Sequence, residues 1–328
     1  MKHILFAVAL LASATVHADE QLRRDGLALF GRIEAPSTLT PEAELGRMLF
    51  WDTRLSLDGK TACASCHPAR DWGADQRRFS VDARGALTSR HSPTVFNAIM
   101  QPTLRWLGDR KDGAEQAESS ITGSMGFASK GAIVEVLTRA DYVPAFRKAY
   151  PGEPQPLTPR NYGRAIAAYE ASLKTPAAFD RFLSGDDSAL TERQKSGMRA
   201  FMTTGCGACH SGALLGGTLM QRFGVVKNYW FETGSTKIDE GRYAITKKEE
   251  DRYVFRVPML RNVAKTAPYF HDASVDRLDR AVRIMASVQL GRSIDDDTIA
   301  SIVAFLESLT GDVPAHYGPP GQKLTNAP

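Results

Sequence analysis

The sequence lacks the long apolar runs of a membrane-spanning protein. Its first apolar run, from Ile4 to Ala12, is shorter than the roughly 20 residues that a membrane helix needs, and no later run is longer. The sequence also lacks a strong charge of one sign. Its 41 Lys and Arg residues are interleaved with 37 Asp and Glu residues, which leaves a net charge of +4. We therefore expect no membrane span and no nucleic-acid partner.

The short apolar run instead predicts a secretory signal peptide. It follows Lys2 and precedes the small-residue site Val16-His17-Ala18, which is the order typical of a cleaved leader. We expect cleavage after Ala18, so that residues 1–18 form the signal and the mature chain is periplasmic. Removal of Lys2 lowers the net charge from +4 to +3 (4 − 1). A retained N-terminal anchor is the alternative.

Cysteine is scarce, and its placement is informative. All four cysteines lie in two copies of one pattern, Cys63-Ala-Ser-Cys66-His67 and Cys206-Gly-Ala-Cys209-His210. An exported chain would ordinarily oxidise four thiols to disulfides, but Cys-x-x-Cys-His is the attachment signature of c-type haem. The two thiols on one turn reach the two vinyl groups of a porphyrin, and the adjacent imidazole reaches the iron.

Zinc binding and thiol redox chemistry are the alternatives for such cysteine pairs. A zinc site needs two more ligands at regular spacing near each pair, and the sequence offers none. A thioredoxin-like motif is expected once, after a strand in an α/β pattern, but strand signals are sparse here. The sequence therefore predicts two covalently attached c-type haems, one at each motif.

Helix signals surround both motifs. The pairs Thr40-Pro41 and Thr158-Pro159 predict helix starts, because threonine caps and proline fits the first helical position. A capping box at residues 191–194 predicts the helix before the second motif, and residues 293–296 cap a strong helix near the C-terminus. The predicted fold is mainly α, with two cytochrome c-like domains, each around one covalently bound c-type haem.

The polar segment 184–188 is the expected boundary between these domains. The N-terminal domain then spans residues 19–184 and holds the first haem. The C-terminal domain spans residues 185–311 and holds the second haem. Residues 312–328 are rich in Gly and Pro, which predicts an irregular tail.

Each motif histidine is expected to supply one axial ligand, His67 to the first iron and His210 to the second. The group on the opposite side of each iron then decides function. Outside the signal and the tail, only His91 and His271 remain as further histidines. Methionine is the other common axial ligand. The methionines downstream of the second motif are Met220, Met259 and Met285.

Several longer stretches resemble one protein family. The first is Leu45-Gly-Arg-Met-Leu-Phe-Trp-Asp-Thr-Arg-Leu-Ser, which leads into the first motif, and the second is Ser92-Pro-Thr-Val-Phe-Asn-Ala. The third is Phe255-Arg-Val-Pro-Met-Leu-Arg-Asn-Val-Ala-Lys-Thr-Ala-Pro-Tyr-Phe-His-Asp. From about Leu45 to Gly311, the chain resembles the bacterial di-haem cytochrome c peroxidases and the related MauG-like oxidases.

The resemblance implies roles for single residues. Met285 matches the methionine that ligates the second, high-potential haem, where MauG-like relatives have tyrosine, and Met259 is the runner-up. Trp106 matches the tryptophan between the two haems, which makes it an electron relay. Gln116 matches the glutamine of the peroxide pocket at the first haem, and His271 is expected to be a hydrogen-bonding group near the haems. A purely structural role is the alternative for each.

Two positions depart from the family pattern at the first haem. Ser124 stands where the family has the glutamate of the peroxide pocket, and loss of one positioned proton shuttle typically costs about 10² to 10⁴ in rate. Glu118 is a nearby substitute in the sequence. Ala83 stands where many members hold a removable histidine, so we expect the first iron to be five-coordinate at rest unless His91 closes the site.

A third departure concerns calcium. The family's calcium site between the domains uses an asparagine side chain with backbone oxygens. His91 replaces that asparagine, while Thr266 and Pro268 remain. This departure argues against a calcium ion.

The resemblance implies a peroxidase that reduces hydrogen peroxide to water. Its electrons would come from a small redox protein, either a cytochrome c or a cupredoxin, enter at the second haem and reach peroxide at the first. A MauG-like oxidase of a partner protein is one alternative. A di-haem electron carrier without enzymatic activity, with both irons six-coordinate, is another. A homodimer is compatible with the sequence, which leaves the oligomeric state open.

Overall fold

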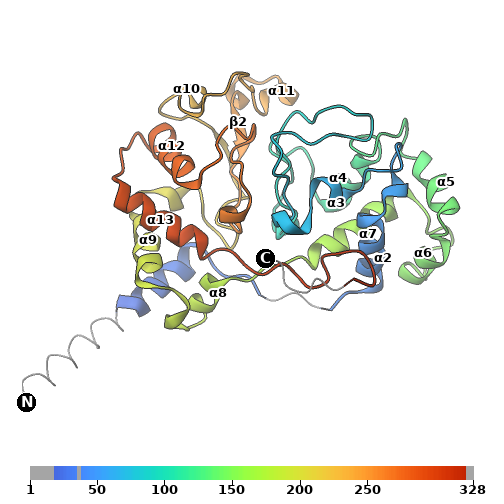
Figure 1. Cartoon of the computed structure of the whole chain (residues 1–328), viewed down its shortest axis with the longest axis horizontal. Coiled ribbons are helices and arrows are strands. Elements are labelled where there is room, and N and C mark those ends of the chain that lie inside the picture. Colours follow the sequence, from blue (N-terminus) through green and yellow to red (C-terminus); the bar gives the residue numbers. More distant parts are fainter. Residues whose placement is uncertain (1–17, 35–37, 323–328) are drawn as a thin grey trace, which may run out of the picture.

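The computed structural model describes residues 18–34 and 38–322. The predicted signal peptide therefore lies outside the described residues, except for Ala18. The helices gather in two groups, one toward each end of the longest axis, with the chain crossing between them (Figure 1). Within the described part of the chain, no helix is long and apolar enough to span a membrane.

Regular structure is mostly helical, as predicted. The α-helices of the first half are α2 (Pro41–Trp51), α3 (Cys63–Cys66), α4 (Gly113–Ser120), α5 (Ala132–Arg139), α6 (Val143–Ala149) and α7 (Pro159–Ala171). Those of the second half are α8 (Ala178–Leu183), α9 (Glu192–Thr203), α10 (Tyr229–Thr233), α11 (Tyr243–Thr246), α12 (Leu278–Leu290) and α13 (Asp296–Glu307). Residues 18–29 are also helical. Strands β1 (Met220–Arg222) and β2 (Val254–Arg256) form one short antiparallel pair.

The predicted helix starts are confirmed by their caps. The Thr40 hydroxyl accepts a hydrogen bond from the Ala43 amide at 3.2 Å, and the Thr158 hydroxyl accepts one from the Asn161 amide at 3.1 Å. Thr191 and Gln194 form the reciprocal capping box at the start of α9. Each cap satisfies a backbone N–H that has no partner within the helix.

One packing arrangement occurs in both helix groups. In the first group, Gly46 of α2 lies so close to α7 that an added Cβ would be 1.9 Å from the Ala165 carbonyl oxygen. In the second group, Gly197 of α9 faces α13, where a Cβ would be 1.8 Å from the Ser301 oxygen. Any larger residue at either glycine would force the two helices apart.

The repeat extends to the aromatic residue one turn after each glycine. Phe50 is fully buried with its ring centroid 6.5 Å from that of His67, and Phe201 is buried with its ring 6.3 Å from that of His210. A glycine-mediated helix pair and a phenylalanine ring beside the motif histidine thus occur at both Cys-x-x-Cys-His motifs.

The chain crosses between the two cores. Phe30, before α2, is buried in the core of α9 and α13, whereas Tyr317, after α13, is buried in the core of α2 and α7. The described tail residues 312–322 contain no helix and no strand. They are nevertheless anchored, because Arg47 donates hydrogen bonds to the carbonyls of Gly318 and Pro319 at 2.7 and 2.9 Å. The domain boundary at residues 184–188 stays a prediction.

Candidate functional site

The first motif presents its histidine in the form that a metal needs. Cys63 and Cys66 lie at the two ends of α3, and the His67 amide donates to the Cys63 carbonyl at 3.1 Å. The His67 Nδ1 lies 2.8 Å from the Gly73 carbonyl oxygen. Because a carbonyl only accepts, Nδ1 carries the proton and Nε2 keeps its lone pair. Burial lowers the pKa of His67, which favours the neutral imidazole that ligates metals.

The second motif has the same geometry. The His210 amide donates to the Cys206 carbonyl at 3.0 Å, and Nδ1 lies 3.1 Å from the Leu215 carbonyl oxygen. Leu215 adopts a positive φ of 49°, which turns its carbonyl toward the ring. Burial lowers the pKa of His210 to about 4. Both imidazoles are therefore neutral at neutral pH, with Nε2 available.

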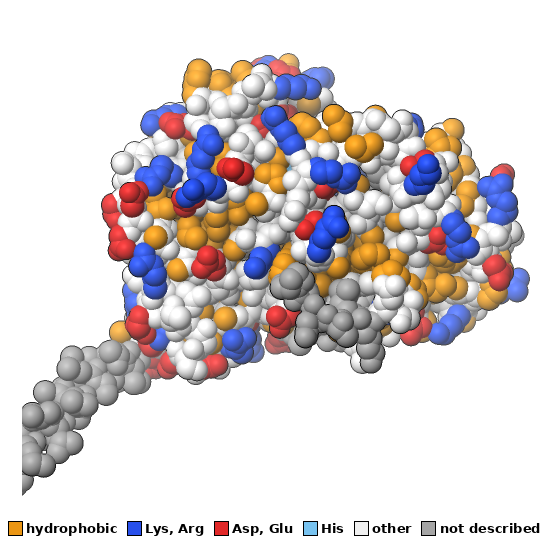
Figure 2. Space-filling view, viewed as in Figure 1, with side chains coloured by type: hydrophobic (Ala, Val, Ile, Leu, Met, Phe, Trp, Pro, Cys, Tyr) orange, Lys and Arg blue, Asp and Glu red, His pale blue; other side chains and the backbone are white. Residues whose placement is uncertain are grey.

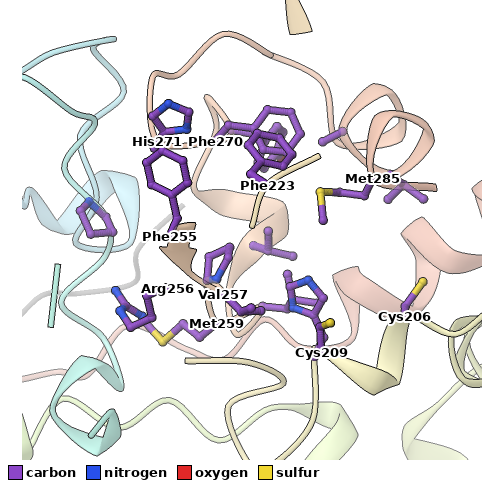
Figure 3. Close-up of a pocket in the computed structure, with 18 of the residues that line it drawn as sticks. Cys206, Cys209, Phe223, Phe255, Arg256, Val257, Met259, Phe270, His271 and Met285 are labelled. Carbon is purple, nitrogen blue, oxygen red and sulfur yellow. The ribbon is translucent and has the colours of Figure 1, made fainter. Parts of the chain in front are cut away.

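A cavity opens beside the second motif (Figure 3). Cys206 lines one end, and Arg256 and His271 lie toward the other end. Many of the other residues that line the cavity are apolar, among them Phe201, Val257, Leu260, Ile302 and Leu306. The cavity is thus largely apolar, bears the Cys206 thiol at one end and bears polar groups at the other.

Met285 and Met259 both line this cavity but differ in direction. Met285 extends its sulfur into the cavity from α12, whereas the sulfur of Met259 lies near Arg256 (Figure 3). Thioether sulfur is an axial ligand of haem iron in cytochromes c. Of these two methionines, Met285 is the better placed to face an iron held by His210.

These features fit a haem better than a bare metal ion. The described residues contain no group of three or more His, Cys, Asp or Glu side chains that could hold a metal ion. The cavity instead combines two thiols, an imidazole, a thioether and apolar walls, which match the vinyl groups, the iron and the porphyrin face. Its polar end matches the carboxylates of a haem. The residues present therefore fit the group that the motif predicts.

Trp106 lies between the two halves of the chain. Its indole Nε1 donates to the His91 carbonyl at 2.8 Å, and its own carbonyl accepts from the Arg256 amide at 2.7 Å. Its ring centroid lies 6.3 Å from that of His271, in an edge-to-face arrangement. Trp106, His91 and His271 all line the cavity of the second motif, so the sequence-predicted relay is adjacent to that site.

His271 has a free nitrogen in this cavity. It is 2% exposed, and its Nε2 has no hydrogen-bond partner among the described residues. The nearest acidic oxygen, Asp239 Oδ2, is 3.9 Å away, which is beyond hydrogen-bond range. An unsatisfied buried nitrogen at a cavity is consistent with its predicted role as a hydrogen-bonding group near a haem.

Gln116 lies on α4, away from the second motif. Its side-chain oxygen is buried and has no hydrogen-bond partner among the described residues. α4 packs on α7, which carries the buried Tyr162. Burial is the main cause that raises the pKa of the Tyr162 phenol, and the negative charge of a nearby Cys63 thiolate raises it further. These contacts bring α4 toward the first motif, although no hydrogen bond joins Gln116 to His67.

The two departures at the first motif meet in one place. The Ala83 amide donates to the Ser124 carbonyl at 2.9 Å, and Ala83 is 6% exposed. Arg84 strengthens this contact by donating to the carbonyls of Thr122 and Gly123 at 3.1 and 3.0 Å. The loop that carries Ala83 is therefore held against the turn that carries Ser124.

Two acidic residues of the first half of the chain differ in their surroundings. Glu118 forms an ion pair with Lys130 at 2.8 Å near the surface, so it is already neutralised by another side chain. Glu170 was not predicted from the sequence. Burial is the main cause that raises the pKa of the Cys63 thiol, and the charge of the nearby Glu170 raises it further. Burial raises the pKa of Glu170 to about 8. A carboxyl that stays protonated at neutral pH can donate a proton.

The predicted replacement in the calcium site is buried and fixed. The His91 amide donates to the His271 carbonyl at 2.8 Å, and its Nδ1 lies 3.2 Å from the Arg77 carbonyl oxygen. Thr266 and Pro268 line the same cavity as His91. Calcium prefers oxygen ligands, and the resemblance puts the imidazole of His91 at the position of the family's asparagine. The residues present do not fit a calcium ion.

Comparison with known proteins identifies the family. The family model described as di-haem cytochrome c peroxidase matches residues 40–188. The cytochrome c551 peroxidase of Pseudomonas aeruginosa is 45% identical over 276 residues, which cover 83% of this chain and 80% of that protein. The chain belongs to the di-haem cytochrome c peroxidase family. The cytochrome c551 peroxidase of Nitrosomonas europaea is 39% identical, covering 86% of this chain and 85% of that protein.

MauG-like relatives belong to the same wider group. The methylamine utilization protein MauG of Methylophilus methylotrophus is 30% identical and covers 84% of each chain. Among solved structures, a MauG-like protein associated with microbial copper homeostasis superposes with a TM-score of 0.76 at 25% identity, covering 88% of this chain and 97% of that one. The predicted family is confirmed, and so is the prediction of a peroxidase-type oxidoreductase. The individual site residues stay predictions.

Proposed function

We propose that this di-haem peroxidase carries two covalent c-type haems, one in each of two cytochrome c-like domains, and reduces hydrogen peroxide in the periplasm. The observation that carries the proposal is the cavity of the second motif, which Met285 and His210 both line. Both motifs present a neutral histidine with a free Nε2, and the first motif has Ala83 at the position of the family's removable histidine. A haem whose iron has two protein ligands suits electron entry, and a haem whose iron has one free position suits substrate binding.

The haems supply the redox chemistry, in which each peroxide takes up two electrons and two protons and yields two water molecules. The chain's own residues bind the haems, orient peroxide and deliver protons. His210 and Met285 would hold the second haem, and a small donor protein, either a cytochrome c or a cupredoxin, would supply the electrons. Trp106 lies on the route from that haem toward His91 and the first half of the chain. Gln116, with its unpaired side-chain oxygen, is proposed to orient peroxide at the first haem.

The group that would deliver protons at the first haem differs from the glutamate of the family. Ser124 lacks a carboxyl, and Glu118 is paired with Lys130. Glu170 is partly exposed and lies near Cys63, and desolvation raises the pKa of its carboxyl to about 8, so we propose it as a candidate proton donor. Methionine rather than tyrosine at position 285 favours the peroxidase over a MauG-like oxidase of a partner protein.

A resting optical spectrum followed by peroxide addition tests the proposal. Haem-stained denaturing gels and the mass of the mature chain should first show two covalent haems. The oxidised protein should then show one high-spin and one low-spin haem, and hydrogen peroxide should oxidise reduced cytochrome c in its presence. Two low-spin haems without peroxide turnover would identify an electron carrier instead, and zinc in place of haem would end the proposal.

A further inference from the structure

Two buried arginines line the cavity of the second motif, and they differ in their partners. Arg261 is 1% exposed and donates from both terminal nitrogens to Asp180, at 2.6 and 2.9 Å. Its Nε donates to the Ala213 carbonyl at 2.8 Å. This guanidinium is fully neutralised and hydrogen-bonded by the protein itself.

Arg256 has no such carboxylate. It is 5% exposed, and its Nε donates to the Arg105 carbonyl at 2.9 Å. Among the described residues, no acidic side chain forms an ion pair with it, and no hydrogen bond uses its two terminal nitrogens. Burial lowers the pKa of Arg256 to about 10, with no acidic neighbour to offset the effect.

A buried charge without a counter-ion is costly, because the protein interior solvates it poorly. Arg256 lines a cavity, so the missing anion can be supplied by whatever fills that cavity. Cys206 lies toward the other end (Figure 3). A porphyrin attached there through its vinyl edge would extend its opposite edge, which bears two propionate carboxylates, across the cavity that Arg256 lines.

We infer that Arg256 binds a propionate of the haem attached at Cys206 and Cys209, and thereby positions that haem against Trp106. The inference rests on the proposed covalent haem, but not on peroxide as its substrate. The Arg256 amide and Nε both bond to the segment of Trp106, through the carbonyls of Trp106 and Arg105. The guanidinium is thus fixed relative to the proposed relay, and its charge stabilises the reduced form of the second haem.

Redox titration of the holoprotein tests this inference. The variants are Arg256→Gln, which removes the charge, and Arg256→Lys, which keeps it. Arg193→Gln is the matched control, because it removes one charge from an exposed ion pair with Asp297. Arg256→Gln should lower the potential of the second haem by an amount equal to about a tenfold change in its reduction equilibrium, roughly 59 mV. Arg256→Lys should retain most of the potential, and Arg193→Gln should leave it unchanged.

The pH dependence separates this role from a general loosening of the fold. Beside a guanidinium, a propionate titrates below its ordinary range, so the wild-type potential should be flat from about pH 5 to pH 8. In Arg256→Gln the potential should rise as the pH falls, because the carboxylate then takes up a proton within that range. The haem stain and the low-spin spectrum of the second haem serve as controls for an intact site.

Three results would overturn the inference. One is a potential in Arg256→Gln that matches that of Arg193→Gln at every pH. Another is an equal drop in Arg256→Lys, which would make the charge irrelevant. The third is a shift of the first haem's potential alone, which would assign the carboxylate to the other haem. Absence of covalent haem in the wild-type protein would instead contradict the proposed function. Failure of the inference and failure of the proposed function are therefore distinguishable.

Discussion

At the scale of single residues, the site depends on a few directed polar contacts. The carbonyls of Gly73 and Leu215 fix which nitrogen of each motif histidine is protonated, at 2.8 and 3.1 Å. Such contacts orient a ligand ring and increase its basicity. Each acceptor lies only five or six residues beyond its histidine, so the loop after each motif has a direct function in ligand geometry.

Met285 is the residue on which the assignment of the second haem depends. Met285→Ala should abolish the methionine–iron charge-transfer band and lower the potential of the second haem, because the variant removes the soft thioether ligand. Near-infrared absorption and redox titration provide the measurements. Met259→Ala is the matched control, since its sulfur lies at the Arg256 side of the cavity. If only the control loses the band, Met259 is the ligand.

At the scale of elements, the segment between the first motif and Trp106 decides whether the first site is open. Its only histidine, His91, uses its amide, its Nδ1 and its carbonyl in hydrogen bonds to three different residues. Movement of His91 onto an iron would break all of them. Ala83, at the position of the family's removable histidine, has no ligating atom in its side chain and is held against the turn of Ser124.

We therefore predict that the first haem meets peroxide without prior reduction. The fully oxidised protein should show a high-spin signal in its electron paramagnetic resonance spectrum and should react with peroxide in a stopped-flow experiment. His91→Gln should leave both unchanged, because His91 is not the ligand. A wholly low-spin oxidised protein that becomes reactive only after one-electron reduction would contradict this prediction.

The same segment predicts independence from calcium. Extended dialysis against a calcium chelator should change neither the high-spin signal nor the thermal unfolding midpoint, because the buried imidazole of His91 occupies the place of an oxygen ligand. His91→Asn provides the matched comparison, since it restores the family's residue and should make the midpoint rise with added calcium. Loss of the high-spin signal from the wild-type protein on chelation would show that calcium is bound after all.

At the scale of the whole molecule, the chain is held together by contacts between distant segments. Arg90, just before His91, forms a two-pronged ion pair with Asp239 in the second half, at 2.7 and 2.8 Å. Both side chains are about five-sixths buried, at 16% and 17% exposure. Burial alone would raise the pKa of Asp239, but the hydrogen bonds and charge of Arg90 outweigh it and lower that pKa.

This pair predicts a pH-dependent contribution to stability. Arg90→Gln should lower the free energy of unfolding at pH 7 by about 2 kcal/mol, because it removes charged hydrogen bonds and leaves Asp239 without a cation. A carboxyl with a lowered pKa stabilises the fold above its unfolded pKa of about 3.9 and loses that effect as the pH falls through the folded value. Urea unfolding from pH 7 to pH 3 should therefore show the difference shrinking.

Arg193→Gln is again the control for this prediction, since its partner Asp297 is 84% exposed and exposed pairs contribute about 1 kcal/mol or less. A loss in Arg90→Gln no larger than in Arg193→Gln would show that the pair does not stabilise the assembled halves. A loss that stays constant down to pH 3 would show that packing of the Arg90 side chain, rather than its charge, is responsible.

The sequence alone determined the features that depend on neighbouring residues. The two motifs, the helix caps at Thr40, Thr158 and Thr191, and the family could all be read from local patterns. Caps and attachment motifs are short-range, because each joins atoms only a few residues apart. The departures at Ser124, Ala83 and His91 likewise required only a match of residue types.

The tertiary structure decided which groups meet across long distances in the chain. Only folding brings Arg256 to the cavity of Cys206 and leaves its guanidinium without a carboxylate partner among the described residues. Arg261, five residues later, instead forms hydrogen bonds with Asp180. Only folding brings Glu170 close to Cys63. Charge pairing and desolvation depend on what surrounds a side chain in three dimensions, and hydrophobic periodicity along one segment does not contain that information.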